Sequence, residues 1–435
     1  MIKAKHLLSL ACVGALALGA IGCGNSSSQT AKTTGKTTIE YWHVNAESFG
    51  GQTVKQLVDQ FNKENPDIEV VAKYNPDMYK GLTQNLQASM ASGKNPDVVQ
   101  MGYSYLNYAG DNLKYVDIQD LINKQAPEDK TYLQDNFLPN ILNLATTDGG
   151  KQIGLPYSMS VPVLYYNPDL FKQAGLDPNQ PPKTWQEVTE YAKTIKEKTN
   201  TVGFFMQEYA DNWAQQALIE SNGGQMLTKK DGKTVAAFDS PEAAQAYQVL
   251  ADMVKDGSGL HATNEEAFQA FLSGKLAMVC TTIGKRENFE KSAKFTVMAT
   301  QFPTFGDKPR KVPAGGNLLM VFSQSPEKQK AAWRFVKFLE SPAALAVWTK
   351  GTGYMPPRKG VTEDPNGLKD FVAQNKNMQA AMAQTPSIVK WASFPGANSL
   401  QAEQALIDVR DVILSGKQAA SAALSEAAAK VNALL

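Results

Sequence analysis

Apolar positions along the chain repeat with two periods, one typical of helices and one typical of strands. The helical spacing i, i+3, i+4, i+7 is clearest at Val54, Leu57, Val58 and Phe61. Alternation typical of a half-buried strand follows directly after it. The first hundred residues predict the order strand 38–44, helix 54–64, strand 68–74, helix 78–92 and strand 98–101. This order is typical of a mainly parallel sheet covered by helices.

A second unit of the same kind begins after Pro156. A dense apolar strand is expected at 161–166, followed by a helix that begins at Asn167-Pro168. Thr184 and Glu187 have the spacing of a capping box, which predicts the start of another helix. The last third of the chain reads as mostly helical. Two such units in a chain of 435 residues predict two α/β domains or lobes.

The N-terminal residues have the features of an export signal rather than of folded structure. Two lysines precede a short apolar run at 7–19, which is shorter than the about 20 residues needed to cross a bilayer. Small residues then precede Cys23, and this pattern resembles the lipobox of bacterial lipoproteins. We expect residues 1–22 to be a signal peptide and 23–36 to be a lipidated Cys23 with a flexible polar tether. The alternative is ordinary secretory cleavage next to an incidental cysteine.

Charge and cysteine content narrow the classes of protein further. The 43 basic and 42 acidic side chains nearly cancel, which argues against a nucleic-acid partner. Of three cysteines only Cys280 lies in the body of the chain, so no internal disulfide is expected. Its apolar surroundings predict a buried small side chain. The chain is expected on the extracytoplasmic face of the cell membrane, held there by its lipid.

The sequence offers little for catalysis. After the signal only His43 and His261 remain, and neither a zinc-protease motif nor a nucleophile elbow is present. We therefore expect a binding protein and not an enzyme, without metal or cofactor. The carboxylate pair of a glycosidase leaves no sequence signature, so a secreted hydrolase stays an alternative, as does a lipid-anchored adhesion module.

Several short segments together resemble a known family. They lie at 41–43, 61–66, 93–99, 162–167, 174–185 and 270–278. From roughly Thr37 to Leu435 the chain resembles the extracellular solute-binding proteins of family 1, the maltose-binding-like receptors of ABC importers. The resemblance implies the type II periplasmic-binding-protein fold, in which two α/β lobes are joined by crossover strands and a hinge and the ligand lies between them.

The resemblance also implies boundaries and partners. We expect lobe 1 at 37–158 plus 276–314 and lobe 2 at 159–275 plus 315–435. The predicted crossings lie near 157–161, Lys275 and 313–317. The expected partners are a small sugar ligand, integral-membrane permease subunits and the lipid bilayer, and we expect a monomer.

Carbohydrate clefts combine aromatic rings, which pack on sugar C–H faces, with short polar groups that bind hydroxyls. On this basis and from the resemblance, we expect ligand contacts from His43, Tyr79, Tyr103, Trp213, Gly316, Asn317 and Tyr354. For each aromatic side chain the alternative is core packing, and for the glycine it is a hinge that needs unusual dihedral angles.

Two alternatives remain for the chemical class of the ligand. The stretch 162–185 is most similar to glycerol 3-phosphate receptors of the family. However, no Lys or Arg occurs at 391–398, where the family has a phosphate-contacting arginine, and Tyr103 stands where an acidic residue is expected. The basic pair Lys285-Arg286 could hold an anion; the alternative is a solvated face. We expect a mono- or oligosaccharide, with glycerol 3-phosphate or a glycerophosphodiester as the alternative.

Overall fold

Two separate sheets form the core, one from each of the predicted units. A computed structural model describes residues 35–207 and 211–435, and the body Lys36–Leu435 forms one unit. The first sheet has the order β2 (Ile68–Tyr74), β1 (Thr37–His43), β3 (Val98–Gly102), β12 (Gly315–Val321) and β4 (Leu155–Ser160). The second sheet has the order β10 (Met298–Gln301), β5 (Pro162–Tyr166), β9 (Leu276–Thr282) and β6 (Val202–Met206). We call each sheet with its covering helices the first and the second lobe.

Both sheets are mixed rather than mainly parallel. β1 runs parallel to β2 and β3, and β6 runs parallel to β9, as the strand–helix–strand pattern predicts. β12 and β5 run antiparallel to their neighbours, because the chain enters these strands from the other lobe. The remaining strands form two small ladders, β11 (Val312–Pro313) with β13 (Ile388–Val389) and β7 (Leu227–Lys230) with β8 (Lys233–Ala236).

Amphipathic helices cover the first sheet. The stripe predicted from Val54, Leu57, Val58 and Phe61 is buried on α1 (Gly51–Glu64). The ring of Phe61 meets Phe335 edge-on, with centroids 5.1 Å apart, and so joins α1 to α13 (Pro326–Leu339). The other helices of this lobe are α2 (Met78–Ala91), α3 (Leu106–Asn112), α4 (Ile118–Gln125), α5 (Tyr132–Asn136), α6 (Pro139–Leu142) and α14 (Pro342–Thr352).

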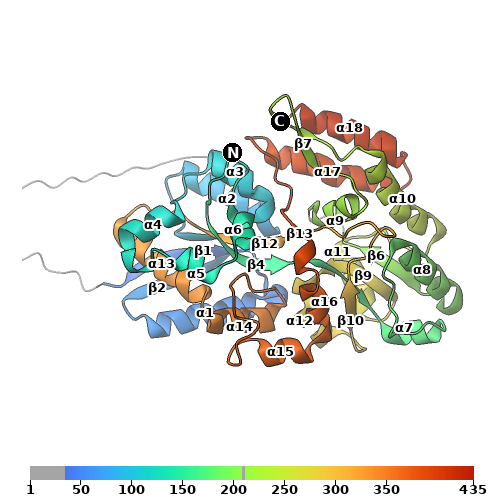
Figure 1. The fold of residues 1–435 in the computed structure, drawn as a ribbon, viewed down its shortest axis with the longest axis horizontal. Helices are drawn as coiled ribbons and strands as arrows, with labels where there is room; N and C mark the ends of the chain where they lie inside the picture. The colour runs from blue at the N-terminus through green and yellow to red at the C-terminus, as the bar shows by residue number, and fades with distance from the viewer. Residues whose placement is uncertain (1–34, 208–210) are drawn as a thin grey trace, which may run out of the picture. The chain divides into compact units, whose positions relative to one another are not determined.

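The second lobe carries a larger helical layer. Thr184 and Glu187 form the predicted capping box at the start of α8 (Trp185–Thr199). α10 (Pro241–Asp256), α17 (Ser399–Leu414) and α18 (Ala420–Asn432) pack side by side (Figure 1). The others are α7 (Pro168–Gln173), α9 (Trp213–Ser221), α11 (Asn264–Leu272), α12 (Arg286–Ser292), α15 (Lys369–Gln374) and α16 (Lys376–Met382).

Strand pairing corrects the predicted lobe boundaries. Segment 276–314 was expected in the first lobe, but β9 pairs with β5 and β6 of the second sheet. Segment 315–435 was expected in the second lobe, but β12 pairs with β3 and β4. The predicted return near Lys275 does not occur, because the apolar strand β9 fills the space between β5 and β6.

The chain passes between the lobes at neighbouring points. β4 ends at Ser160 in the first sheet and β5 begins at Pro162 in the second, as predicted. The chain returns between Pro313 and Gly315. Near the first crossing, Met159 and Met355 exchange two backbone hydrogen bonds. These closely spaced connections form the joint between the lobes.

Candidate ligand site between the lobes

A crevice lined by both lobes lies beside the joint. Its volume is about 750 Å³. The first lobe contributes Ser48, Phe49 and Met78. The second lobe contributes Gln207, Asp211, Asn264, Glu265, Phe268, Thr282 and Lys285, among others. Aromatic rings, amides, hydroxyls and charges of both signs therefore face one space, as in sites for small polar ligands.

Three of the residues predicted as ligand contacts come together next to this crevice. Asn317 Nδ2 donates a hydrogen bond of 3.1 Å to the hydroxyl of Tyr79. The side chains of Tyr79 and Tyr354 are hydrogen-bonded to each other. All three side chains are buried, and burial raises the pKa of both phenols. The phenols are therefore neutral and able to donate hydrogen bonds.

The two tyrosines are held by close packing. The ring of Tyr354 stacks on Trp348 at 5.9 Å with an interplanar angle of 7°, and lies 5.8 Å from Phe49. Tyr79 lies over Gly102 at the end of β3, where an added Cβ would come within 2.5 Å of its ring. Only glycine at this position leaves room for the ring.

Trp213 and Trp391 form an aromatic pair at the second-lobe side of the joint. Trp213 Nε1 donates to the carbonyl oxygen of Pro313 across 2.9 Å. Its ring packs so closely on Gly315 that a Cβ there would lie 2.7 Å from it. Trp391 lies 6.2 Å from Trp213 by ring centroids and donates to Asn212 Oδ1 at 2.8 Å.

Three charged residues near this pair were not identified from the sequence. Arg410 Nη1 donates to the backbone carbonyl of Asp211 at 3.2 Å. Burial raises the pKa of Asp211 to about 6, although the Trp213 N–H donates to its carboxylate. Burial also raises the pKa of Glu403 to about 7, with Tyr105 as its hydrogen-bond partner. Glu403 and Arg410 share one face of α17 at i and i+7, the only local signal that could have paired them.

Several buried polar atoms around the joint have no hydrogen-bond partner within the described ranges 35–207 and 211–435. They include Ser158 Oγ, Asn212 Nδ2 and Asn317 Oδ1. The hydroxyl of Tyr103, another predicted contact, is buried beside the backbone of Tyr157. An unpaired buried polar group costs about 1–3 kcal/mol. Such groups are retained where a ligand or water completes their hydrogen bonds.

Two other predicted contacts, His43 and Gly316, make close contacts within the protein itself. His43 ends β1 between Tyr41 and Tyr74, and its Nδ1 accepts the backbone N–H of Asn45 at 3.3 Å. Burial lowers its pKa to about 4, so it is neutral. Gly316 has φ 106°, and a Cβ there would lie 2.1 Å from Ser158 O, which accounts for the glycine by backbone packing.

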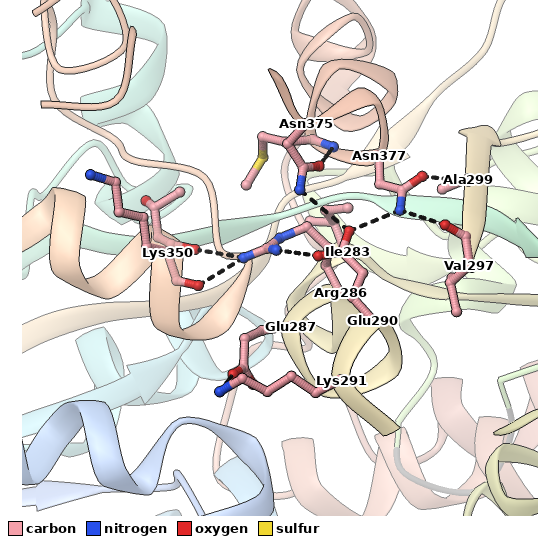
Figure 2. A network of polar contacts seen from close by, with 12 residues as sticks. Ile283, Arg286, Glu287, Glu290, Lys291, Val297, Ala299, Lys350, Asn375 and Asn377 are labelled. Atoms are coloured by element: carbon pink, nitrogen blue, oxygen red, sulfur yellow. Dashed lines mark hydrogen bonds and ion pairs between the residues drawn. The ribbon is translucent and has the colours of Figure 1, made fainter. Parts of the chain in front are cut away.

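The two residues of the predicted basic pair, Lys285 and Arg286, have different surroundings. Lys285 lines the crevice. Arg286 is buried and donates to the carbonyl oxygens of Thr349 and Lys350 and to Glu290 (Figure 2). Arg286 therefore does not face the crevice. Cys280 is buried as predicted, whereas Cys23 lies outside the described residues.

Comparison with known proteins gives the family. The family model for bacterial extracellular solute-binding proteins matches residues 46–346. The chain belongs to this family. It is a solute-binding receptor, and receptors of this family serve ABC importers. Within the described ranges, no helix is both long and apolar enough to cross a membrane.

Two relatives named as glycerol 3-phosphate-binding proteins match this chain over nearly its full length. The sn-glycerol-3-phosphate-binding periplasmic protein UgpB of Shigella dysenteriae is 28% identical, over 97% of this chain and 96% of the relative. The protein of the same name from Pectobacterium atrosepticum is 29% identical, over 96% and 95%.

Solved structures agree with the two-lobed receptor fold. UgpB from Mycobacterium tuberculosis, in complex with glycerophosphocholine, gives a TM-score of 0.78 at 20% identity, covering 92% of this chain and 98% of that one. The cyclic alpha-maltosyl-1,6-maltose binding protein from Arthrobacter globiformis gives 0.75 at 24% identity, covering 92% and 99%.

Proposed function

We propose that this receptor captures a mono- or oligosaccharide between its lobes and delivers it to a membrane permease. The observation that supports this most strongly is the set of unpaired buried polar atoms around the joint, next to Trp213, Trp391 and Tyr354. Sugar C–H faces pack on aromatic rings, and each hydroxyl both donates and accepts hydrogen bonds. The hydroxyls of a saccharide would supply the hydrogen-bond partners that these buried polar atoms lack, and its C–H faces would pack on the rings.

The charges near the tryptophan pair support hydroxyls rather than phosphate at that position. Asp211 and Glu403 are carboxylic acids with raised pKa values, and both repel a phosphate when ionised. Ionised or not, a carboxyl group accepts hydrogen bonds from sugar hydroxyls. The cation Arg410 lies beside this group and donates to the backbone carbonyl oxygen of Asp211.

Glycerol 3-phosphate or a glycerophosphodiester is the second candidate. The relatives named as glycerol 3-phosphate-binding proteins favour it, and so do the cations Arg410 and Lys285 near the joint. The identity to these relatives lies below 30%. The two acidic side chains beside Trp213 weigh against it.

We infer from the fold how the ligand closes the receptor. The ligand stabilises the closed arrangement only by contacting both lobes at once, and Tyr79 of the first lobe and Trp213 of the second are suited to this.

Cys23 is proposed to carry a lipid that holds the receptor at the extracytoplasmic face. We propose a monomer that binds its ligand without converting it.

A thermal-shift panel of sugars, polyols and glycerol phosphates tests this proposal on the body from Thr37 onwards. A ligand bound only by the folded state raises stability by about 2.7 kcal/mol at a hundredfold excess over Kd. A shift with one class of saccharide is expected. A shift confined to the glycerol phosphates would instead establish the second candidate.

A further inference from the structure

Lys285 and Arg286 are adjacent in sequence but differ in what surrounds their charges. Figure 2 shows Arg286 between Lys350 and Glu290. Glu290 in turn accepts from Asn375 and Asn377, so the guanidinium belongs to a polar network of the protein itself. This arginine is held in that network and, unlike Lys285, does not line the crevice.

The ammonium group of Lys285 has a different environment. Its Nζ lies 4.4 Å from the ring centroid of Phe49 in the first lobe and 5.5 Å from that of Phe268 in the second. Across the described ranges, no hydrogen-bond or ion-pair acceptor is found for this Nζ, and the residue is only partly exposed. Aromatic faces attract the cation, but they satisfy none of its three N–H donors.

The other charges of the crevice form no ion pair with Lys285 in the part of the chain that the structure describes. Asp211 accepts the backbone N–H of Trp213, and Arg410 is the charge that most lowers its pKa. Glu265 also lines the crevice, without an ion pair to Lys285 among the described residues. A partly buried ammonium without a counter-ion is costly unless a bound group compensates it.

We propose that the ligand carries an anionic group, carboxylate or phosphate, which the ammonium of Lys285 binds in the crevice between Phe49 and Phe268. This proposal rests on the proposed function, since the rest of the ligand is taken to be a polyhydroxylated skeleton near Trp213 and Asp211. A charge-assisted hydrogen bond is roughly twice as strong as a neutral one. The substrate class is therefore an acidic saccharide or a sugar phosphate rather than an uncharged sugar.

Isothermal titration calorimetry on the body from Lys36 tests this with matched pairs of probes. The pairs are digalacturonate with its neutral counterpart galactobiose, and glucose 1-phosphate with glucose; inorganic phosphate is added as a bare anion. We expect one acidic probe to bind at least about tenfold tighter than its neutral partner. The pair that shows the preference distinguishes carboxylate from phosphate.

Substitutions then assign the preference to Lys285. Lys285→Gln should abolish the preference for the acidic probe, while Lys285→Arg should retain most of it. Lys291→Gln is the matched control, because Lys291 pairs with Glu287 on the exposed face of α12. Thermal unfolding of each variant checks that the fold is kept.

Two results would overturn the proposal in different ways. Equal binding of acidic and neutral saccharides, unchanged in Lys285→Gln, would refute the anionic group and leave the saccharide function in place. Binding of no saccharide of either kind would refute the proposed function, and the inference with it.

Discussion

The indole Nε1 of Trp213 donates a hydrogen bond to the carbonyl oxygen of Pro313, 2.9 Å away. Pro313 lies where the chain leaves the second lobe for β12 of the first. A side chain proposed to contact the ligand is thus attached to the backbone of the joint. Contact between a sugar and this indole is therefore linked directly to the position of the crossover strand.

Trp213→Phe tests this link. The variant keeps an aromatic ring but leaves the Pro313 carbonyl without its donor, which should cost about 1 kcal/mol of stability. Affinity for the best saccharide of the panel should fall about tenfold, as measured by calorimetry. Affinity equal to that of the unaltered protein would show that Trp213 serves packing alone.

Gly316→Ala tests how tightly β12 and β4 approach each other at the joint. The new Cβ would lie 2.1 Å from Ser158 O, at a residue with φ 106°. Gly175→Ala is the matched control, since Gly175 has φ 79° with open space around it. We expect about 1–2 kcal/mol of destabilisation in the control from the backbone alone.

Gly316→Ala should cost at least about 2 kcal/mol more than this control, because the new methyl group also clashes with the neighbouring strand. Urea unfolding of both variants measures the difference. Equal losses would show that β4 moves aside without strain.

Arg286→Met tests the network of Figure 2. The variant leaves Glu290 without its cation and removes the hydrogen bond to the carbonyl oxygen of Lys350, whereas the carbonyl oxygen of Thr349 still accepts from the Gly353 N–H. Removing one partner of a buried ion pair costs about 3–5 kcal/mol. Lys291→Met removes the ion pair between the exposed Lys291 and the half-buried Glu287, and should change stability by less than about 1 kcal/mol. Similar losses in both variants, measured by urea unfolding, would contradict the account.

His43 should make the protein less stable in acid. Burial lowers its folded-state pKa to about 4, whereas the unfolded side chain protonates near its ordinary value of 6.5. Between these values the unfolded state binds more protons, so stability falls as the pH drops from 6.5 towards 4. The size is of order 3 kcal/mol.

His43→Gln should remove this contribution while keeping an acceptor for the Asn45 N–H. The difference in unfolding free energy between the two proteins, measured from pH 7 to pH 4, reports the histidine alone. A difference that stays constant across this range would rule out a buried neutral His43.

Local features of the fold could be predicted from the sequence. The stripe on α1 and the capping box of α8 depend on residues within three to seven positions of one another. The lobe boundaries could not be predicted in this way. Both β9 and β12 are buried apolar runs, and their choice of sheet depends on partners more than a hundred residues away.

The candidate site was likewise predictable only in part from the sequence. Aromatic residues at helix starts and in an irregular loop drew attention to Tyr79, Trp213 and Tyr354, which lie around the joint. Arg410 was overlooked because only the packing of α17 brings it to Asp211. Lys285 and Arg286 were interpreted as one basic pair, because the sequence does not show that their side chains point into different surroundings.

Calorimetric titration of the body with the saccharide that gives the largest thermal shift tests the central claim most directly. We predict saturable binding at one site per chain, weakened at least about tenfold in Asn317→Leu, whose amide contacts Tyr79. Unaltered binding in that variant, or saturable binding of glycerol 3-phosphate with none of any saccharide, would contradict a sugar receptor with its site at the joint of the lobes.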